Sequence, residues 1–243
     1  MASTRSLEPI ILDDYIIPVT IHKEFRRSIR FSITRKGLVI RCPVLSSTSN
    51  ISENATKWCN NVIKTKPAAV AEFRIIDYFS TDHIDLLGNR YTLNITKSLT
   101  SRDSISWIDN IINITISDEY PTHLASKSIK DLIIKFAIRR FTPVIEERVR
   151  SLNERLFNVH INKVRLKNNR TNWGSCSSRG NINLSVRLLK APEETIDYVI
   201  IHELAHRIEM NHSKRFWNII AQVCPSYKSH EKWLKTNGHL CQF

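Results

Sequence analysis

The chain has 243 residues, of which 42% are hydrophobic and 24% are charged, as in ordinary globular proteins. Because no apolar run reaches the roughly 18 residues of a membrane span, the sequence excludes a transmembrane helix and predicts no membrane partner. The formal net charge of +13 favours polyanionic partners, although a solubilising surface would have the same composition.

The cysteines and the N-terminal segment both predict a cytoplasmic protein. Five cysteines are scattered without a CxxC pair, which indicates reduced thiols (Cys42, Cys59, Cys176, Cys224 and Cys241). The first residues lack the basic head, continuous apolar stretch and cleavage site of a secretory signal.

The first half of the chain, residues 1–122, is predicted to be rich in strands. RFSITRKGLVIRCP (30–43) is typical of a hairpin, and a helix is expected over 52–64. Strand character returns at 86–96 around a Gly88-Asn89 turn, and residues 104–117 predict two further short strands. There is no repeated unit in the sequence.

After Tyr120-Pro121 the apolar spacing becomes helical, from residue 126 to 157, and Pro143 is expected to kink or split this helix. Two strands should follow, within 161–168 and 181–189, on either side of the loop NRTNWGSCSSRG. Pro192 suits the first turn of the next helix, which should end near Met210-Asn211. Two short helices, near 213–223 and 228–237, complete the chain.

These elements predict an α+β fold with two regions. We expect a β-rich region over 1–122 and a hydrolase domain over 123–243.

The pentapeptide His202-Glu203-Leu204-Ala205-His206 carries the strongest chemical signal. Two histidines four residues apart lie on one face of a helix, so their imidazoles can share one ion. Glu203 lies on the next row, where it can reach a water on that ion as a general base. The alternative is a helix that uses two histidines as polar neighbours, but two unpartnered imidazoles among apolar residues would be costly to bury.

His212 follows just past the expected helix end, where a turn can bring its ring back as a third ligand. Three protein ligands leave a fourth position for water, as catalytic zinc requires. The sequence therefore predicts one Zn²⁺ held by His202, His206 and His212.

A longer stretch resembles the YgjP-like metallopeptidases, which are related to the SprT-like zincins. The matching residues include WGSCS (173–177), Pro192, HELAH (202–206), Asn211-His212-Ser213, Phe216-Trp217 and Cys224-Pro225. The resemblance implies a zincin-like catalytic part with zinc on the three histidines and Glu203 as base. Two positions depart from the pattern, because Asn172 stands where an arginine is expected and Arg207 where an aliphatic residue is usual.

The favoured interpretation is hydrolysis of a peptide or protein substrate by water that Glu203 activates on zinc. The alternating strand 181–188 is the candidate border of the substrate cleft, with Asn183 and Ser185 as lining residues. His230 is a further candidate for contact with the substrate.

Two alternatives use the basic segments of the chain. Residues 155–192 contain no acidic residue but eight basic ones (Arg155, Lys163, Arg165, Lys167, Arg170, Arg179, Arg187 and Lys190). This suits a nucleotide, whose phosphoanhydride the same water could cleave, or a nucleic acid bound by a module with structural zinc. Structural zinc normally has four protein ligands, and the sequence suggests only His230 or Glu209 as a fourth.

Overall fold

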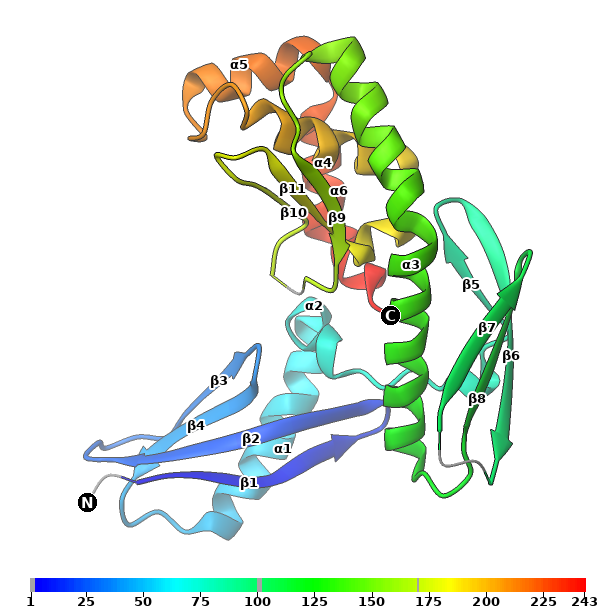
Figure 1. Cartoon of the computed structure of the whole chain (residues 1–243). Helices are drawn as coiled ribbons and strands as arrows, with labels where there is room; N and C mark the ends of the chain where they lie inside the picture. Colours follow the sequence, from blue (N-terminus) through cyan, green and yellow to red (C-terminus); the bar gives the residue numbers. More distant parts are fainter. Residues whose placement is uncertain (1–2, 100–101, 170) are drawn as a thin grey trace. The chain divides into compact units, whose positions relative to one another are not determined.

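The computed structural model of the chain describes residues 3–99, 102–169 and 171–243 (Figure 1). Contacts divide it into two compact units, Met1–Ile76 and Asp77–Phe243. No helix in the described part is long and apolar enough to cross a membrane. The arrangement of strands and helices confirms the predicted α+β class.

The first unit is a four-stranded sheet with one main helix. Its strands have the order β1-β2-β4-β3, and β2 and β4 are parallel. The bounds are β1 (Ser3–Leu12), β2 (Tyr15–Glu24), β3 (Arg30–Thr34) and β4 (Gly37–Pro43), then α1 (Thr48–Thr65), α2 (Pro67–Val70) and η1 (Ala71–Phe73). β3 and β4 are the hairpin that the sequence predicts.

Alternation along the central strands makes the core of this unit. Ile17, Val19 and Ile21 are buried on one face of β2, while Pro18 between them is exposed. Apolar positions of α1, among them Ile51, belong to the same buried cluster. The unit therefore has a core of its own.

The second unit begins with a sheet of the same topology. Its strand order is β5-β6-β8-β7, again with a parallel central pair between two hairpins. The bounds are η2 (Tyr78–Ser80), β5 (His83–Leu86), β6 (Asn89–Ser98), β7 (Ser104–Ile108) and β8 (Ile111–Ser117). The topology thus repeats although the sequence does not, since a sheet needs only alternation and turn residues, not the same side chains.

The long helix α3 (Thr122–Leu156) belongs to the second unit too. The boundary between the two units, at 76/77, therefore comes earlier in the chain than the change from strand to helix at 122/123. Its first half packs on the sheet, where the ring of Phe136 lies 4.9 Å from that of Trp107. Of the two outcomes expected at Pro143, a kink or a split, the split does not occur, because α3 continues through the proline. Buried Phe141 and Ile145 flank the proline, and their packing on both sides holds the helix together.

A three-stranded sheet follows, with the order β10-β11-β9. Its strands are β9 (Lys163–Lys167), β10 (Gly174–Cys176) and β11 (Asn181–Ser185). β10 lies in the stretch that the sequence predicts as loop. The chain turns into η3 (Val186–Lys190) after Ser185, so the predicted strand 181–189 is too long.

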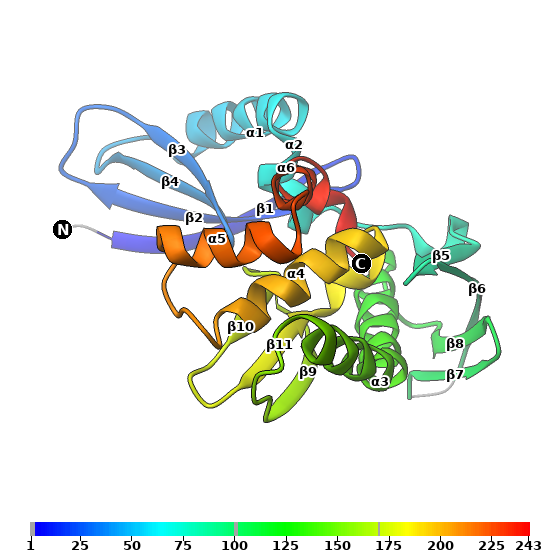
Figure 2. The same cartoon turned by 90° about the horizontal axis from the view of Figure 1, so that it is seen from above.

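The remaining helices are α4 (Glu193–Ala205), α5 (Lys214–Val223), α6 (Tyr227–Asn237) and η4 (Gly238–Cys241) (Figure 2). Pro192 precedes the first turn of α4, as expected. Arg148 of α3 donates hydrogen bonds to Asp197 at 2.5 Å and to Glu193 at 2.9 Å, which ties α4 to α3. Both helices are thereby fixed beside the small sheet.

α4 ends five residues before the expected Met210. The amide of Arg207 donates to Leu204 O, and that of Ile208 to Ala205 O, so the hydrogen bonds tighten to the i−3 pattern. His206 therefore occupies the C-cap position and not the interior of the helix.

Candidate active site

The last turn of α4 carries the first histidine and the glutamate. Apolar neighbours such as Ile200, Ile201 and Leu204 are buried and anchor the helix. Glu203 is only 5% exposed and His206 only 9%. Glu203 and His206 are thus buried at the C-terminal end of α4, next to its apolar residues.

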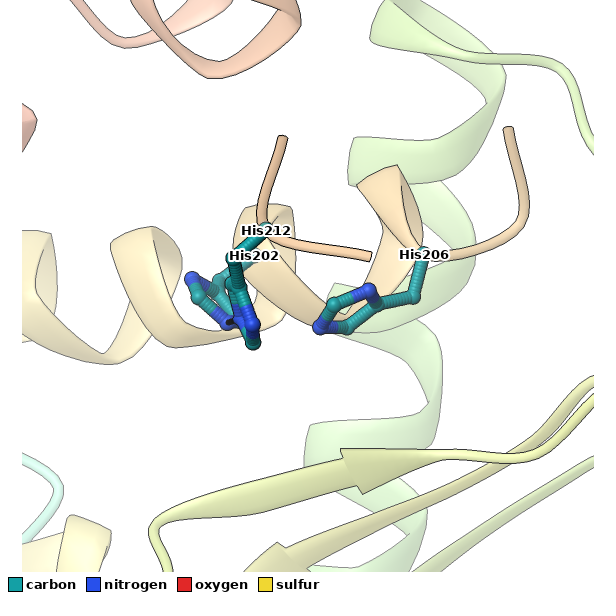
Figure 3. A group of neighbouring side chains, drawn as sticks. All are labelled: His202, His206 and His212. Carbon is teal, nitrogen blue, oxygen red and sulfur yellow. Dashed lines mark hydrogen bonds between the residues drawn. The ribbon is translucent and has the colours of Figure 1, made fainter. Parts of the chain in front are cut away.

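The structure brings together the three histidines that the spacing predicts (Figure 3). One ligand atom from each of His202, His206 and His212 lies within 4.8 Å of the others, and the Nε2 atoms of His202 and His212 are 3.0 Å apart. Tetrahedral zinc with Zn–N bonds of about 2.0–2.1 Å places its ligand nitrogens about 3.3 Å apart. Three imidazole nitrogens at this separation match zinc in the number of ligands, in their chemistry and in their distances.

A backbone carbonyl orients the ring of His206. Its Nδ1 lies 3.1 Å from Glu209 O, so the neutral ring donates from Nδ1 and keeps a lone pair on Nε2. Metal-binding histidines commonly have such a partner on the other nitrogen. The early end of α4 supplies this partner, because the chain turns back over its own last residues.

The start of α5 fixes His212. The Ser213 side chain caps the helix by accepting a hydrogen bond from the Phe216 amide at 3.3 Å. His212 directly precedes this cap, so its backbone direction is set by the helix. The sequence predicts that a turn after α4 brings this third ligand back, and the cap of α5 is a further feature that fixes its position.

Phe216 contacts all three histidines, a role that its place in the family pattern of the sequence does not reveal. Its ring is completely buried, and its centroid lies 4.9 Å from that of His202, 4.6 Å from His206 and 4.8 Å from His212. The signal in the sequence is a serine cap with an apolar residue three positions later. We infer that this ring holds the three imidazoles in place.

Burial sets the electrostatics of the site. It lowers the pKa of His202 to about 4, helped by the neighbouring His206 and His212, and it lowers the pKa of His206 as well. These rings are therefore neutral near pH 7, the form that binds metal. Burial also raises the pKa of Glu203 to about 8 in the chain alone, and a cation on the imidazoles would act in the opposite direction.

β10 lies against Glu203. A Cβ at Gly174 would be 2.7 Å from Cγ of Glu203, so only glycine permits this approach. β10 is an edge strand of its sheet, whereas β11 is hydrogen-bonded on both sides. The expectation that strand 181–188 borders the cleft is therefore wrong. The backbone groups of β11 are already paired with β10 and β9, so they cannot pair with a substrate.

The three predicted substrate-binding residues have other partners. Ser185 is completely buried and donates to Asn169 O at 2.9 Å, and Asn183 donates to Ser175 Oγ at 3.3 Å. The ring nitrogens of His230 lie 3.2 Å from the hydroxyls of Thr195 and Ser226. None of the three predicted residues lines the cavity beside the histidines.

A cavity of about 400 Å³ adjoins the site. It is lined by Asn172, Trp173, Gly174, Tyr198, Val199, His202, Glu203, Glu231, Leu234 and Lys235. The residues come from α4, from α6 and from the segment that leads into β10, so the cavity lies within the second unit. α6 contributes Glu231, Leu234 and Lys235 to the cavity, and not the predicted His230 of the same helix.

Arg207 has a structural role that its sequence position conceals. Its guanidinium donates to His160 O at 3.0 Å, to Ser178 O at 2.7 Å and to Ser177 O at 3.3 Å. The end of α4 is thereby tied to the turn between β10 and β11.

The basic segment does not gather at the cavity. Lys190 is largely buried and donates to Gln242 O at 2.6 Å, and Arg187 donates to Gly238 O at 2.9 Å. Arg170 lies outside the described residues. Among the described residues that line the cavity, the one Lys or Arg is Lys235, which belongs to another segment.

The YgjP-like metallopeptidase domain matches residues 27–237. Among solved structures, the metallopeptidase zymogen of Pyrococcus abyssi abylysin is 28% identical, with 38% of this chain and 93% of that chain covered and a TM-score of 0.36. The metallopeptidase zymogen of Methanocaldococcus jannaschii jannalysin is 26% identical, with 40% and 96% covered and a TM-score of 0.34. A comparison with curated proteins finds no match. Because the family match spans most of its length, the chain belongs to the YgjP-like metallopeptidase family and is a metal-dependent hydrolase.

Proposed function

We propose that the chain hydrolyses peptide bonds with Zn²⁺ held by His202, His206 and His212 and with Glu203 as general base. The observation that carries the proposal is the convergence of three imidazole rings beside a buried carboxyl group. When bound, zinc supplies a Lewis acid that polarises a carbonyl and lowers the pKa of a bound water toward ~7.

The carboxyl group of Glu203 moves the proton. It accepts a proton from the attacking water and passes it to the departing amine nitrogen, so the peptide C–N bond breaks and an acid and an amine form. Its burial against Gly174 keeps the carboxyl in one place and excludes competing water. Such fixed placement is what general base catalysis requires.

β10 is the segment against which we place the substrate backbone. The amide of Ser185 and the carbonyl of Trp173 pair β10 with β11, and the backbone groups of Gly174 therefore point to the other edge. There the side chain of Asn172 donates to Gly174 O at 2.9 Å. An extended peptide beside this edge would run past Glu203.

The ligand set favours catalytic over structural zinc. No fourth His, Cys, Asp or Glu of the described chain joins the three histidines. Both nitrogens of His230 have partners, and Glu209 pairs with Arg215 at 4.0 Å. A position open to water is what a hydrolase needs.

The test compares hydrolysis by the zinc-loaded chain with that by two variants. We expect the wild type to cleave an unfolded, reduced protein, and Glu203→Gln to bind zinc equally but lose at least 100-fold in rate, within the usual range for general base catalysis of about 10²–10⁴. Glu154→Gln, the same substitution at an exposed position of α3, should retain activity.

The same preparations are offered nucleoside triphosphates. Pyrophosphate release that depends on Glu203, without any proteolysis, would overturn the proposal in favour of phosphoanhydride hydrolysis.

A further inference from the structure

The cavity beside the histidines has a side that the proposed chemistry does not use. Tyr198 and Val199 lie one helical turn before His202 and Glu203 on the same face of α4. Leu234 of α6 and Trp173 line the cavity as well. The part of the cavity away from the metal ligands is therefore mainly apolar and aromatic.

The walls are held rigidly. Arg187 lies over the ring of Trp173 with its Cζ 4.4 Å from the centroid, and a Cβ at Gly238 would meet the same ring at 2.5 Å. The ring of Tyr198 stacks on His230 at 5.8 Å. A cavity with such fixed walls is preformed, as ligand sites usually are.

The charges in the cavity favour an uncharged occupant. Glu231 and Lys235 are four residues apart on α6, and their charged atoms are 3.9 Å from each other. This pair offers opposite charges side by side, and Lys235 is 78% exposed. The cavity therefore gives no excess of either sign for a charged side chain.

The distance along α4 decides which substrate residue enters. One helical turn is about 5.4 Å, whereas two residues of an extended peptide span about 6.6 Å. Because His202 and Glu203 themselves line the cavity, we place in it the side chain of a residue directly adjoining the bond that is cleaved.

We propose that this cavity is a specificity site that accepts a large apolar or aromatic side chain next to the scissile peptide bond, with Leu234 and Trp173 as its selecting walls. The inference rests on the proposed peptidase function and names its substrate class. A volume of about 400 Å³ accommodates the largest aromatic side chains, and a small side chain would leave most of it unfilled.

The experiment fills the cavity without touching the metal site. Leu234→Trp places a larger side chain in it, and Lys232→Trp is the matched control at an exposed position of the same helix outside the lining. Zinc-loaded wild type, both variants and Glu231→Gln digest a mixture of unfolded peptides, and mass spectrometry identifies the residues on both sides of each cleaved bond.

We expect the wild type and Lys232→Trp to prefer Phe, Tyr, Trp, Leu or Met at one of the two adjoining positions. In Leu234→Trp this preference should fall by roughly tenfold or more in favour of Ala and Ser, since a few carbon atoms in such a pocket change kcat/KM by about 10–200-fold. Glu231→Gln should leave the preference unchanged.

A second readout does not depend on hydrolysis. N-acetyl-phenylalanine amide should bind the metal-free wild-type chain in an NMR titration more tightly than N-acetyl-alanine amide, and Leu234→Trp should remove the difference. Two results would contradict the specificity site and leave the peptidase function standing. One is cleavage without a size preference, and the other is a preference for Arg and Lys that Glu231→Gln abolishes. Binding of the phenylalanine amide without any cleavage sinks the proposed peptidase and keeps the site.

Discussion

Glu203 and His202 lie in surroundings that disfavour their charged forms. Burial raises the pKa of the first to about 8 and lowers that of the second to about 4. Both effects follow from one cause, the removal of water around an ionisable group. The metal-free site therefore destabilises the folded state, and a bound cation would offset this effect.

The first prediction concerns the stability of the metal-free chain between pH 6.5 and 8. The folded pKa of Glu203 lies above its unfolded value of 4.5, so the folded state binds more protons and the free energy of unfolding falls as pH rises toward 8. The loss should be on the order of 1–2 kcal/mol. Urea unfolding in a chelator measures it, and Glu203→Gln should flatten the dependence, whereas an equal slope in both chains would contradict the assignment.

The second prediction concerns the ring beneath the imidazoles. Phe216→Ala should weaken zinc binding by about 10–100-fold, the usual cost of losing support behind metal ligands. Ile220→Ala is the control, because Ile220 is equally buried one turn further along α5. Competition with a zinc indicator dye gives the affinities; equal losses in both variants would show a general effect of core truncation.

Residue spacing explains why the histidines could be predicted and the substrate residues could not. The four-residue spacing of His202 and His206 fixes their relation on any helix. Ser185 and His230 depend on partners far away in the sequence, Asn169 and Thr195, which no local pattern reveals.

At the scale of elements, the site depends on where α4 stops. The helix ends at Ala205, and the chain then turns so that Glu209 O reaches His206. The sequence predicts a later end because apolar residues such as Ile208 continue the helical spacing. Side-chain contacts after the helix override that periodicity, and Arg207 makes three of them.

The third prediction follows from these contacts. Arg207→Ala should speed amide hydrogen exchange in the turn at 177–180 and lower the free energy of unfolding by about 1–3 kcal/mol, as expected for hydrogen bonds from a charged donor. Arg215→Ala, at a side chain 71% exposed, should change neither. If both variants exchange alike, Arg207 does not hold the turn.

The position of a strand within its sheet also cannot be predicted from the residue pattern of that segment alone. The alternation of residues 181–185 correctly indicates a strand, but its central place in the sheet comes from β10 and β9 on either side. β10 has only three residues, too few for a periodic signal. The sequence therefore predicts a loop where β10 packs against Glu203.

At the scale of the whole molecule, the chain consists of two compact units, each with its own sheet and helix core. The same strand order in both four-stranded sheets arises without sequence similarity, because hairpins and crossovers obey the same packing rules. The net charge of +13 says nothing about this architecture.

The fourth prediction is that residues 77–243 fold alone and bind zinc. The three histidines, their supporting ring and the cavity all belong to this unit. The isolated fragment should show a cooperative thermal transition by circular dichroism, raised by zinc in proportion to its binding. A fragment without such a transition would mean that the first unit is required for folding.

The most direct test of the account is the zinc-edge X-ray absorption spectrum of the loaded full-length chain. The account predicts one zinc per chain with three imidazole nitrogens and an additional oxygen donor at about 2.0–2.1 Å, and loss of stoichiometric binding in His206→Ala. A sulfur ligand, a fourth imidazole, or a wild-type chain that takes up no zinc would contradict it.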